Sequence, residues 1–108
     1  MSNTEAIRKL NDDFRKTFKG GRILVTQGIN ALPPTDVAEI MKMVSQFDTF
    51  EEGDDPYQEH DFGAFDYKGN RIFFKIDYYD TNYEYASEDP ADPSETNRVL
   101  TVMLAEEY

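Results

Sequence analysis

The chain has 108 residues, with 22 acidic and 11 basic side chains, a formal net charge of −11 and a pI near 4.3. It contains no cysteine, which excludes disulfides, thiolate metal sites and cysteine nucleophiles, and this favours a reducing, cytoplasmic location. No run approaches the ~20 apolar residues of a membrane span and the first residues form no signal segment, so we expect one soluble domain over residues 1–108.

The charge is unevenly distributed along the chain. Residues 1–47 hold five acids and seven bases, for a net charge of +2, whereas residues 48–108 hold 17 acids and four bases, for a net charge of −13. An aromatic content of 14% argues against a disordered acidic tail, because such a chain can bury enough apolar surface to fold. Segregation on this scale therefore points to a role for the acidic half in binding.

Residues 4–18 are predicted to form a helix. Ile7, Leu10, Phe14 and Phe18 recur at helical spacing and make a narrow apolar stripe. Basic residues suit the last turn of this helix, and the Gly-Gly pair that follows ends it.

Residues 22–26 read as a short strand that is buried on both faces, because they are almost continuously apolar. Residues 28–34 read as a loop. A second helix is predicted over 35–47, with Thr35 as its N-cap and an apolar stripe behind it.

A central hairpin is predicted over residues 60–78, with Lys68-Gly69 as its two-residue turn. This register pairs Asp66 with Arg71 and His60 with Asp77, whereas a register longer by one residue would oppose two acids. The expected core face of the hairpin carries Phe65, Tyr67, Ile72, Phe74, Ile76 and Tyr78.

The last third of the chain is harder to interpret. Residues 79–86 are predicted to add a fourth, edge strand, and 87–94 a proline-containing loop. A final helix is predicted over 94–107, although Val99–Leu104 could also be a strand. The fold class that follows is α+β, with about three helices packed on one face of a small, mostly antiparallel sheet around the central hairpin.

Two segments contain many acids and no Lys or Arg, and we expect them to form the binding surface. Their carboxylates are spaced densely enough to stand in for the phosphates of nucleic acid, although a merely solubilising acidic surface is the simplest alternative. Three tyrosines nearby could add rigid apolar contacts. The candidate binding residues are Asp48, Glu51, Glu52, Asp54, Asp55, Glu59, Asp61, Asp77, Asp80, Tyr79, Tyr83 and Tyr85.

A catalytic or metal-assisted site is the alternative. His60, the sole histidine, would have to serve any acid–base scheme that uses histidine, with Asp61 or Asp77 as its partner. Several acids in the same segments offer oxygen ligands for Mg²⁺ or Ca²⁺, but their spacing is not that of an EF-hand. We expect no dedicated metal and no cofactor; the residues weighed as ligands are Asp54, Asp55, Glu59, His60, Asp61, Asp77 and Asp80.

Direct binding of nucleic acid is disfavoured. The tyrosines that could stack on bases have acidic neighbours, which would repel phosphate. No Gly-rich phosphate-binding loop and no serine nucleophile motif is present either.

The chain also resembles a family of small bacterial proteins of unknown function, over nearly all of residues 6–108. The resemblance is carried by the segments 7–18, 20–22, 59–65, 75–80, 87–93 and 100–108. Members of that family are often encoded on plasmids and integrative conjugative elements, and the family has no established catalytic residues to carry over. The resemblance thus implies a mobile-element setting.

The leading hypothesis is a non-enzymatic acidic protein that mimics DNA and occupies a basic nucleic-acid-binding partner, such as a restriction or CRISPR complex of host defence. A small enzyme using His60 is the first alternative. An accessory subunit or homodimer that pairs through a sheet edge near Tyr83 is the second, so that the chain is expected to be a monomer or a homodimer without membrane contact.

Overall fold

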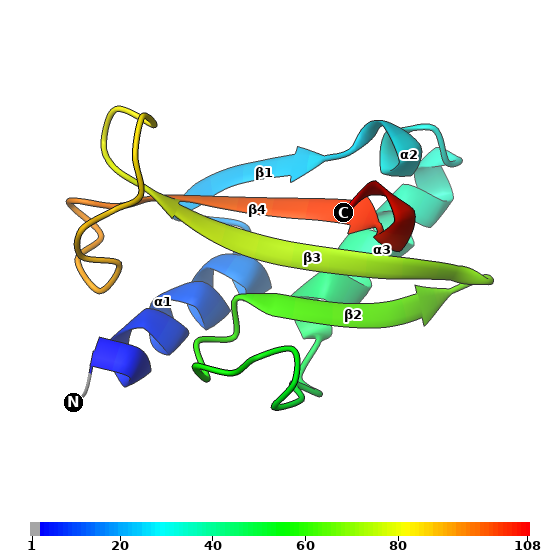
Figure 1. The fold of residues 1–108 in the computed structure, drawn as a ribbon. Helices are drawn as coiled ribbons and strands as arrows, with labels where there is room; N and C mark the ends of the chain where they lie inside the picture. The colour runs from blue at the N-terminus through cyan, green and yellow to red at the C-terminus, as the bar shows by residue number, and fades with distance from the viewer. Residues whose placement is uncertain (1–2) are drawn as a thin grey trace.

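The computed structural model describes residues 3–108, in which a four-stranded sheet is covered on one face by helices (Figure 1). The helices are α1 (Asn3–Thr17), α2 (Gln27–Asn30) and α3 (Pro34–Gln46), followed at the C-terminal end by the 3-10 turn η1 (Ala105–Glu107). The strands are β1 (Gly21–Val25), β2 (Phe62–Tyr67), β3 (Asn70–Tyr79) and β4 (Asn97–Leu104). None of the helices within residues 3–108 is long and apolar enough to cross a membrane.

The sheet has the strand order β1-β4-β3-β2 and is mixed. The strand β3 is antiparallel to both β2 and β4, but β1 runs parallel to β4, with Ile23 beside Leu100. The prediction of a mostly antiparallel sheet is therefore wrong. The parallel pair arises because the last element is a strand that enters the sheet beside β1, between β1 and the hairpin.

The last helix that was predicted, over 94–107, is the central strand β4. Its residues Val99, Leu100, Val102 and Met103 are all buried, on alternating faces of the sheet. A strand buried on both faces reads as a continuous apolar run, which helical spacing can also match over so short a stretch. The β-branched residues of this run favour the strand that is observed.

The predicted fourth strand over 79–86 is also wrong. Only Tyr79 belongs to β3, and one isolated bridge joins it to Ala86. Tyr83 has φ of 57°, so the chain turns there instead of extending. In addition, residues 27–30, most of which were assigned to a loop, form the short helix α2.

The hairpin register is confirmed. Asp66 lies opposite Arg71, Phe65 opposite Ile72 and Gly63 opposite Phe74. The helices at 3–17 and 34–46 and the strand at 21–25 also lie within one or two residues of their predicted positions. The prediction that this strand is buried on both faces is wrong, because it lies at the edge of the sheet with Leu24 exposed. The hydrophobic core lies between the sheet and α1 and α3, and it is formed by Phe14, Ile29, Ile40, Val44, Ile72, Phe74, Ile76, Leu100 and Val102.

Gly63 of β2 leaves room for the rings of Phe74 and Phe47 to pack against the backbone. A Cβ added there would lie 2.3 Å from the Phe74 ring and 2.9 Å from the Phe47 ring. These two rings also pack on each other, and Phe47 packs on Phe50. We therefore expect Gly63→Ala to lower the free energy of unfolding by about 1–3 kcal/mol, because overpacking moves those rings.

The matched control is Gly53→Ala, where nothing lies within 4 Å of the added Cβ. Urea unfolding followed by circular dichroism compares the two variants. Equal midpoints for both would show that the core at Gly63 has room to relax.

Candidate functional site

The two acidic segments lie at the same end of the sheet. Residues 47–61 lead into the start of β2, and residues 80–96 connect the end of β3 to the start of β4. Because β2 and β4 are both antiparallel to β3, these three strand ends coincide, as Figure 1 shows. The two loops together, here called the acidic end, carry seven and six acids and no Lys or Arg.

Asn11 of α1 connects the two acidic loops. Its side-chain N–H groups donate to the backbone oxygen of Glu59, at 3.0 Å, and to the hydroxyl of Tyr78, at 2.7 Å. Its oxygen accepts from Nε of Arg98, at 2.8 Å, and Arg98 also donates to the backbone oxygen of Pro90. Asn11 is fully buried, so each of these bonds is protected from water.

Tyr78 adds a further link within this network. Its hydroxyl donates to the carboxylate of Glu59 at 2.8 Å, and the guanidinium of Arg98 lies 5.2 Å from its ring centre. Burial raises the pKa of Tyr78 well above its usual range and lowers the pKa of Arg98. The acidic end is thus built on a buried polar network that spans α1, β3 and β4.

His60 does not pair with Asp77 as predicted. The ladder of the hairpin stops at Phe62 and Lys75, and His60 has φ of 57°, which turns it out of the strand. Its Nδ1 lies 2.9 Å from a carboxylate oxygen of Asp12 on α1, a partner that sequence reasoning missed. No local pattern could have found it, because 48 residues separate the two side chains.

The second ring nitrogen of His60 also faces a carboxylate. Nε2 lies 3.8 Å from Asp55, which is 4% exposed and accepts the backbone N–H of His60 at 3.0 Å. The ring stacks on Phe50 with centroids 3.9 Å apart. These contacts fasten the loop of residues 47–61 to α1.

Beside His60 lies a depression of about 450 Å³ on the surface. It is lined by Arg8, Phe50, Glu51, Glu52, Asp55, Gln58 and His60. None of these lining side chains is a hydroxyl, thiol or amine nucleophile, and carboxylates flank both nitrogens of the imidazole. The arrangement can hold a cationic group of a partner.

The predicted binding carboxylates divide into an outer and an inner group. Asp48, Glu51, Glu52 and Asp54 are exposed. The others are engaged within the fold: Asp55 with His60, Glu59 with Tyr78, Asp77 with Lys75 at 2.6 Å, and Asp80 with the backbone N–H groups of Asn82 and Glu84, while Asp61 is half-buried.

The three predicted tyrosines lie near the second acidic loop. The Tyr79 and Tyr83 rings are 6.1 Å apart, and the guanidinium of Arg22 on β1 lies 4.2 Å from the Tyr83 ring centre. Tyr85 is 74% exposed. Of the three, Tyr85 is thus the most accessible to a partner.

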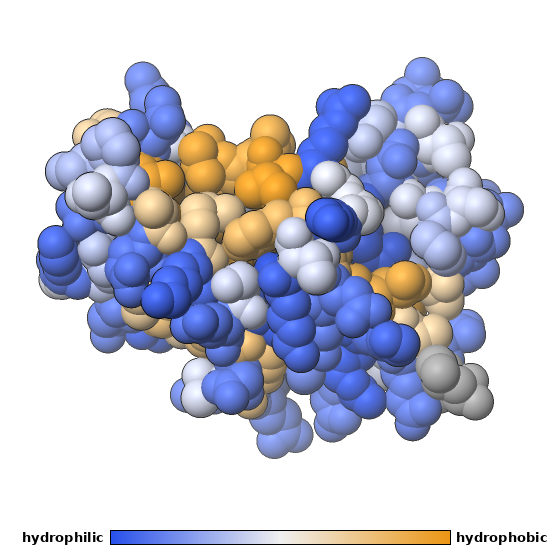
Figure 2. Space-filling view, turned by 180° about the vertical axis from the view of Figure 1, so that it is seen from behind, coloured by the Kyte–Doolittle hydropathy of each residue, from blue (hydrophilic) through white to orange (hydrophobic). Residues whose placement is uncertain are grey.

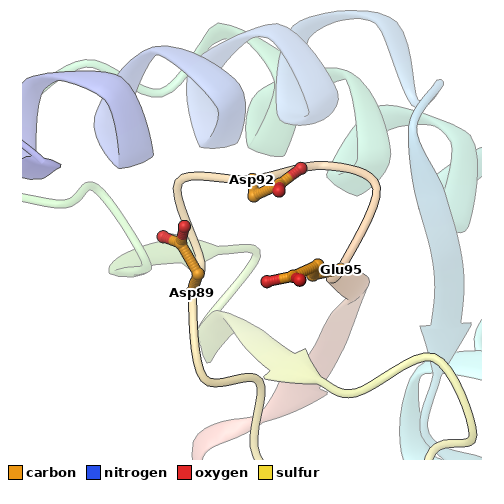
Figure 3. A group of neighbouring side chains, drawn as sticks. All are labelled: Asp89, Asp92 and Glu95. Atoms are coloured by element: carbon orange, nitrogen blue, oxygen red, sulfur yellow. The ribbon is translucent and has the colours of Figure 1, made fainter.

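Three acids of the second loop converge, as Figure 3 shows. One carboxylate oxygen from each of Asp89, Asp92 and Glu95 lies within 4.8 Å of the others. Oxygens of this kind could ligate a hard cation. Asp89 and Asp92 also cap turns of their own loop, because they accept the backbone N–H groups of Ala91 and Ser94.

A family model described as "Protein of unknown function (DUF3768)" matches residues 25–107, which is well over half of the chain. No curated protein and no solved structure matches the chain.

Removal of the Asn11 side chain tests the importance of the buried polar network. Asn11→Ala removes the acceptor of the buried Arg98 Nε and the donor to Tyr78 and to the backbone oxygen of Glu59, while Tyr78 keeps Glu59 and Arg98 keeps Pro90. We therefore expect a loss of about 2–4 kcal/mol in unfolding free energy. Limited proteolysis should also cleave residues 47–61 and 80–96 faster. The control Asn30→Ala, at an exposed position of α2, should change neither measurement.

The stability of the protein should depend on pH through Asp61. Burial, followed by the nearby charges of Glu59, Asp55 and Asp77, raises the pKa of Asp61 from 3.8 to about 6. A raised folded-state pKa means that the stability due to the protonated carboxyl is present below pH 3.8 and is lost as the pH rises through about 6.

Asp61→Asn should therefore raise the unfolding free energy at pH 7 by about 1–2 kcal/mol, after allowance for partial solvent screening, and change little at pH 3.5. Denaturant titrations at the two pH values measure this difference, with exposed Asp48→Asn as the control. A variant that is less stable than the parent at pH 7 would mean that ionised Asp61 is stabilised by contacts.

Proposed function

This chain belongs to the DUF3768 family of proteins of unknown function, and we propose that it is a non-enzymatic acidic interaction protein. In this proposal the acidic end occupies the basic, nucleic-acid-binding surface of a partner protein, and its exposed carboxylates take the places of phosphates. The observation that carries the proposal is that two acidic loops without Lys or Arg, which are distant in the sequence, lie at the same end of the sheet.

Rigidity supports this reading. Duplex DNA presents about one charge per 1.7 Å of its axis, so a competitor needs many carboxylates held at fixed spacings. Here Asn11 and Arg98 attach both loops to the sheet, and His60 attaches the first loop to α1. Carboxylates held in this way lose little conformational entropy when they bind.

The exposed aromatic residue of the second loop supports an interface with a protein. Tyr85 could pack on an apolar part of the partner, where a rigid aromatic side chain provides contact area at low entropic cost. The depression beside His60, with Glu51 and Glu52 in its wall, could receive an arginine or lysine side chain.

The biological setting is an extension of the proposal. The resemblance to proteins encoded on plasmids and conjugative elements makes a host-defence complex in the cytoplasm, of the restriction or CRISPR type, the partner class to try first. Such complexes bind nucleic acid through basic surfaces, which a carboxylate array of this charge would oppose.

Reversing the charge of the outer carboxylates tests the proposal. We expect Glu51→Lys, Glu52→Lys and Asp54→Lys together to abolish retention of nucleic-acid-binding proteins on the immobilised chain at ~50 mM salt, the regime in which such contacts are strongest. The parent should release these proteins as salt rises, and it should displace fluorescent duplex DNA from each of them. Asp55 is left unchanged because it is buried on His60.

The matched control reverses three exposed acids that lie outside the acidic end, Glu39, Asp66 and Glu106, and so changes the net charge equally. It should retain the partner and compete with DNA as the parent does. If both triple variants lose binding equally, only net charge matters; if the parent never competes with DNA, the mimicry proposal fails.

A further inference from the structure

The outer edge of β1 has no neighbouring strand within residues 3–108. In the sheet order β1-β4-β3-β2, β1 has a neighbouring strand on one side alone, and Figure 1 shows no strand or helix lying along its other side. The N–H of Thr26 donates to the backbone oxygen of Val102 at 3.0 Å. Because a strand alternates its hydrogen-bonding direction, the backbone groups of Gly21, Ile23 and Val25 point away from β4, toward solvent.

The surroundings of this edge are apolar. Leu24 is 51% exposed on the face of the sheet that the helices leave open. On the opposite face, Ile23 and Val25 are only partly buried, together with Phe18 and Met41. Figure 2, which views the helix-covered side, shows a hydrophobic patch in the part of the molecule where Figure 1 places β1 and α2.

Charge selects the kind of partner. The 22 residues 14–35 contain no acid and four bases, whereas the whole chain carries −11, so this is the surface on which a second copy meets the least repulsion. Lys19 and Arg22 lie at the start of β1. Its other end adjoins Glu107, which bonds Thr26 and Gly28, so the edge is basic at one end and acidic at the other. Such an edge is complementary to itself when two copies run antiparallel.

We propose that two copies of this chain associate through their β1 edges, paired antiparallel with Ile23 opposite Ile23 of the second copy. This register places Arg22 opposite Leu24 of the second copy, and Gly21 opposite Val25. The two sheets become one eight-stranded sheet, in which the order β2-β3-β4-β1 of one copy is followed by β1-β4-β3-β2 of the second copy. A two-fold axis perpendicular to the sheet keeps the helices of both copies on one face, so that the apolar patches beside β1 meet across the junction.

The same symmetry directs the two acidic ends away from each other. Each β1 starts at the acidic end of its own copy, and antiparallel pairing therefore sends the two acidic ends in opposite directions along the strands. The dimer uses the opposite edge of the sheet from the loop that precedes β2, whereas Tyr83 of the second acidic loop lies beside Arg22 of β1.

Sedimentation velocity over ~1–500 μM tests the proposal. The chain has a mass of 12.5 kDa, so the dimer has twice that, about 25 kDa. We expect a concentration-dependent approach to the dimer mass. A monomer throughout this range would overturn the proposal, as would a larger, open-ended assembly, because the two-fold contact closes.

Substitutions at the two opposed positions test the register. Leu24→Lys faces Arg22 of the second copy with a like charge, and should raise the dimer dissociation constant at least tenfold, whereas Leu24→Glu should leave it unchanged or lower it. Adding Arg22→Glu to Leu24→Lys restores opposite charges and should recover dimerisation. Circular dichroism checks that each variant is folded. Equal effects of Lys and Glu at position 24, or no rescue in the double variant, would exclude this register.

Discussion

The buried guanidinium of Arg15 is the contact on which the rest of the structure depends. It is 1% exposed, and a charge removed from water in this way requires partners. It donates to the backbone oxygens of Val44 and Phe47, at the end of α3, and pairs with Asp12 at 3.1 Å. Its Nε has no hydrogen-bond acceptor within residues 3–108, and the guanidinium lies 5.2 Å from the centre of the Phe50 ring. One side chain thus joins α1 to α3 and begins the connection to the first acidic loop.

Asp12 continues the connection to His60. Asn11, one helical turn before Arg15 on α1, bonds Glu59 and Arg98. The face of α1 toward the loops is therefore polar and buried, a combination that hydrogen bonds must compensate in full. These bonds hold residues 47–61 and 80–96, and in the first of these loops Phe47 and Phe50 also pack against the core. A chain with so large an excess of acid can keep such loops ordered because many of their carboxylates accept backbone N–H groups in turns.

The carboxylates that remain exposed, and the apolar edge of β1, give the molecule two surfaces of opposite character. The acidic end suits a basic partner in water, where long-range attraction dominates and salt weakens it. The β1 edge suits a second copy, where backbone hydrogen bonds and apolar burial operate at short range. The order of strands separates the first acidic loop from the β1 edge, since β1 and β2 form the two edges of the sheet, whereas the second acidic loop reaches β1 through Tyr83 and Arg22.

The sequence by itself determined α1, α3, β1 and the hairpin, because periodicity and turn residues are local and the pairing of Asp66 with Arg71 follows from a two-residue turn. It also identified the acidic segments, since the charged residues are visible in the sequence itself. Only the tertiary structure decided that Val99–Leu104 is a strand, because a short run buried on both faces satisfies either period. It alone decided which carboxylates are engaged within the fold, because Glu59 accepts from Tyr78 of β3 and Asp55 is buried beside His60, whose ring is held by Asp12 of α1.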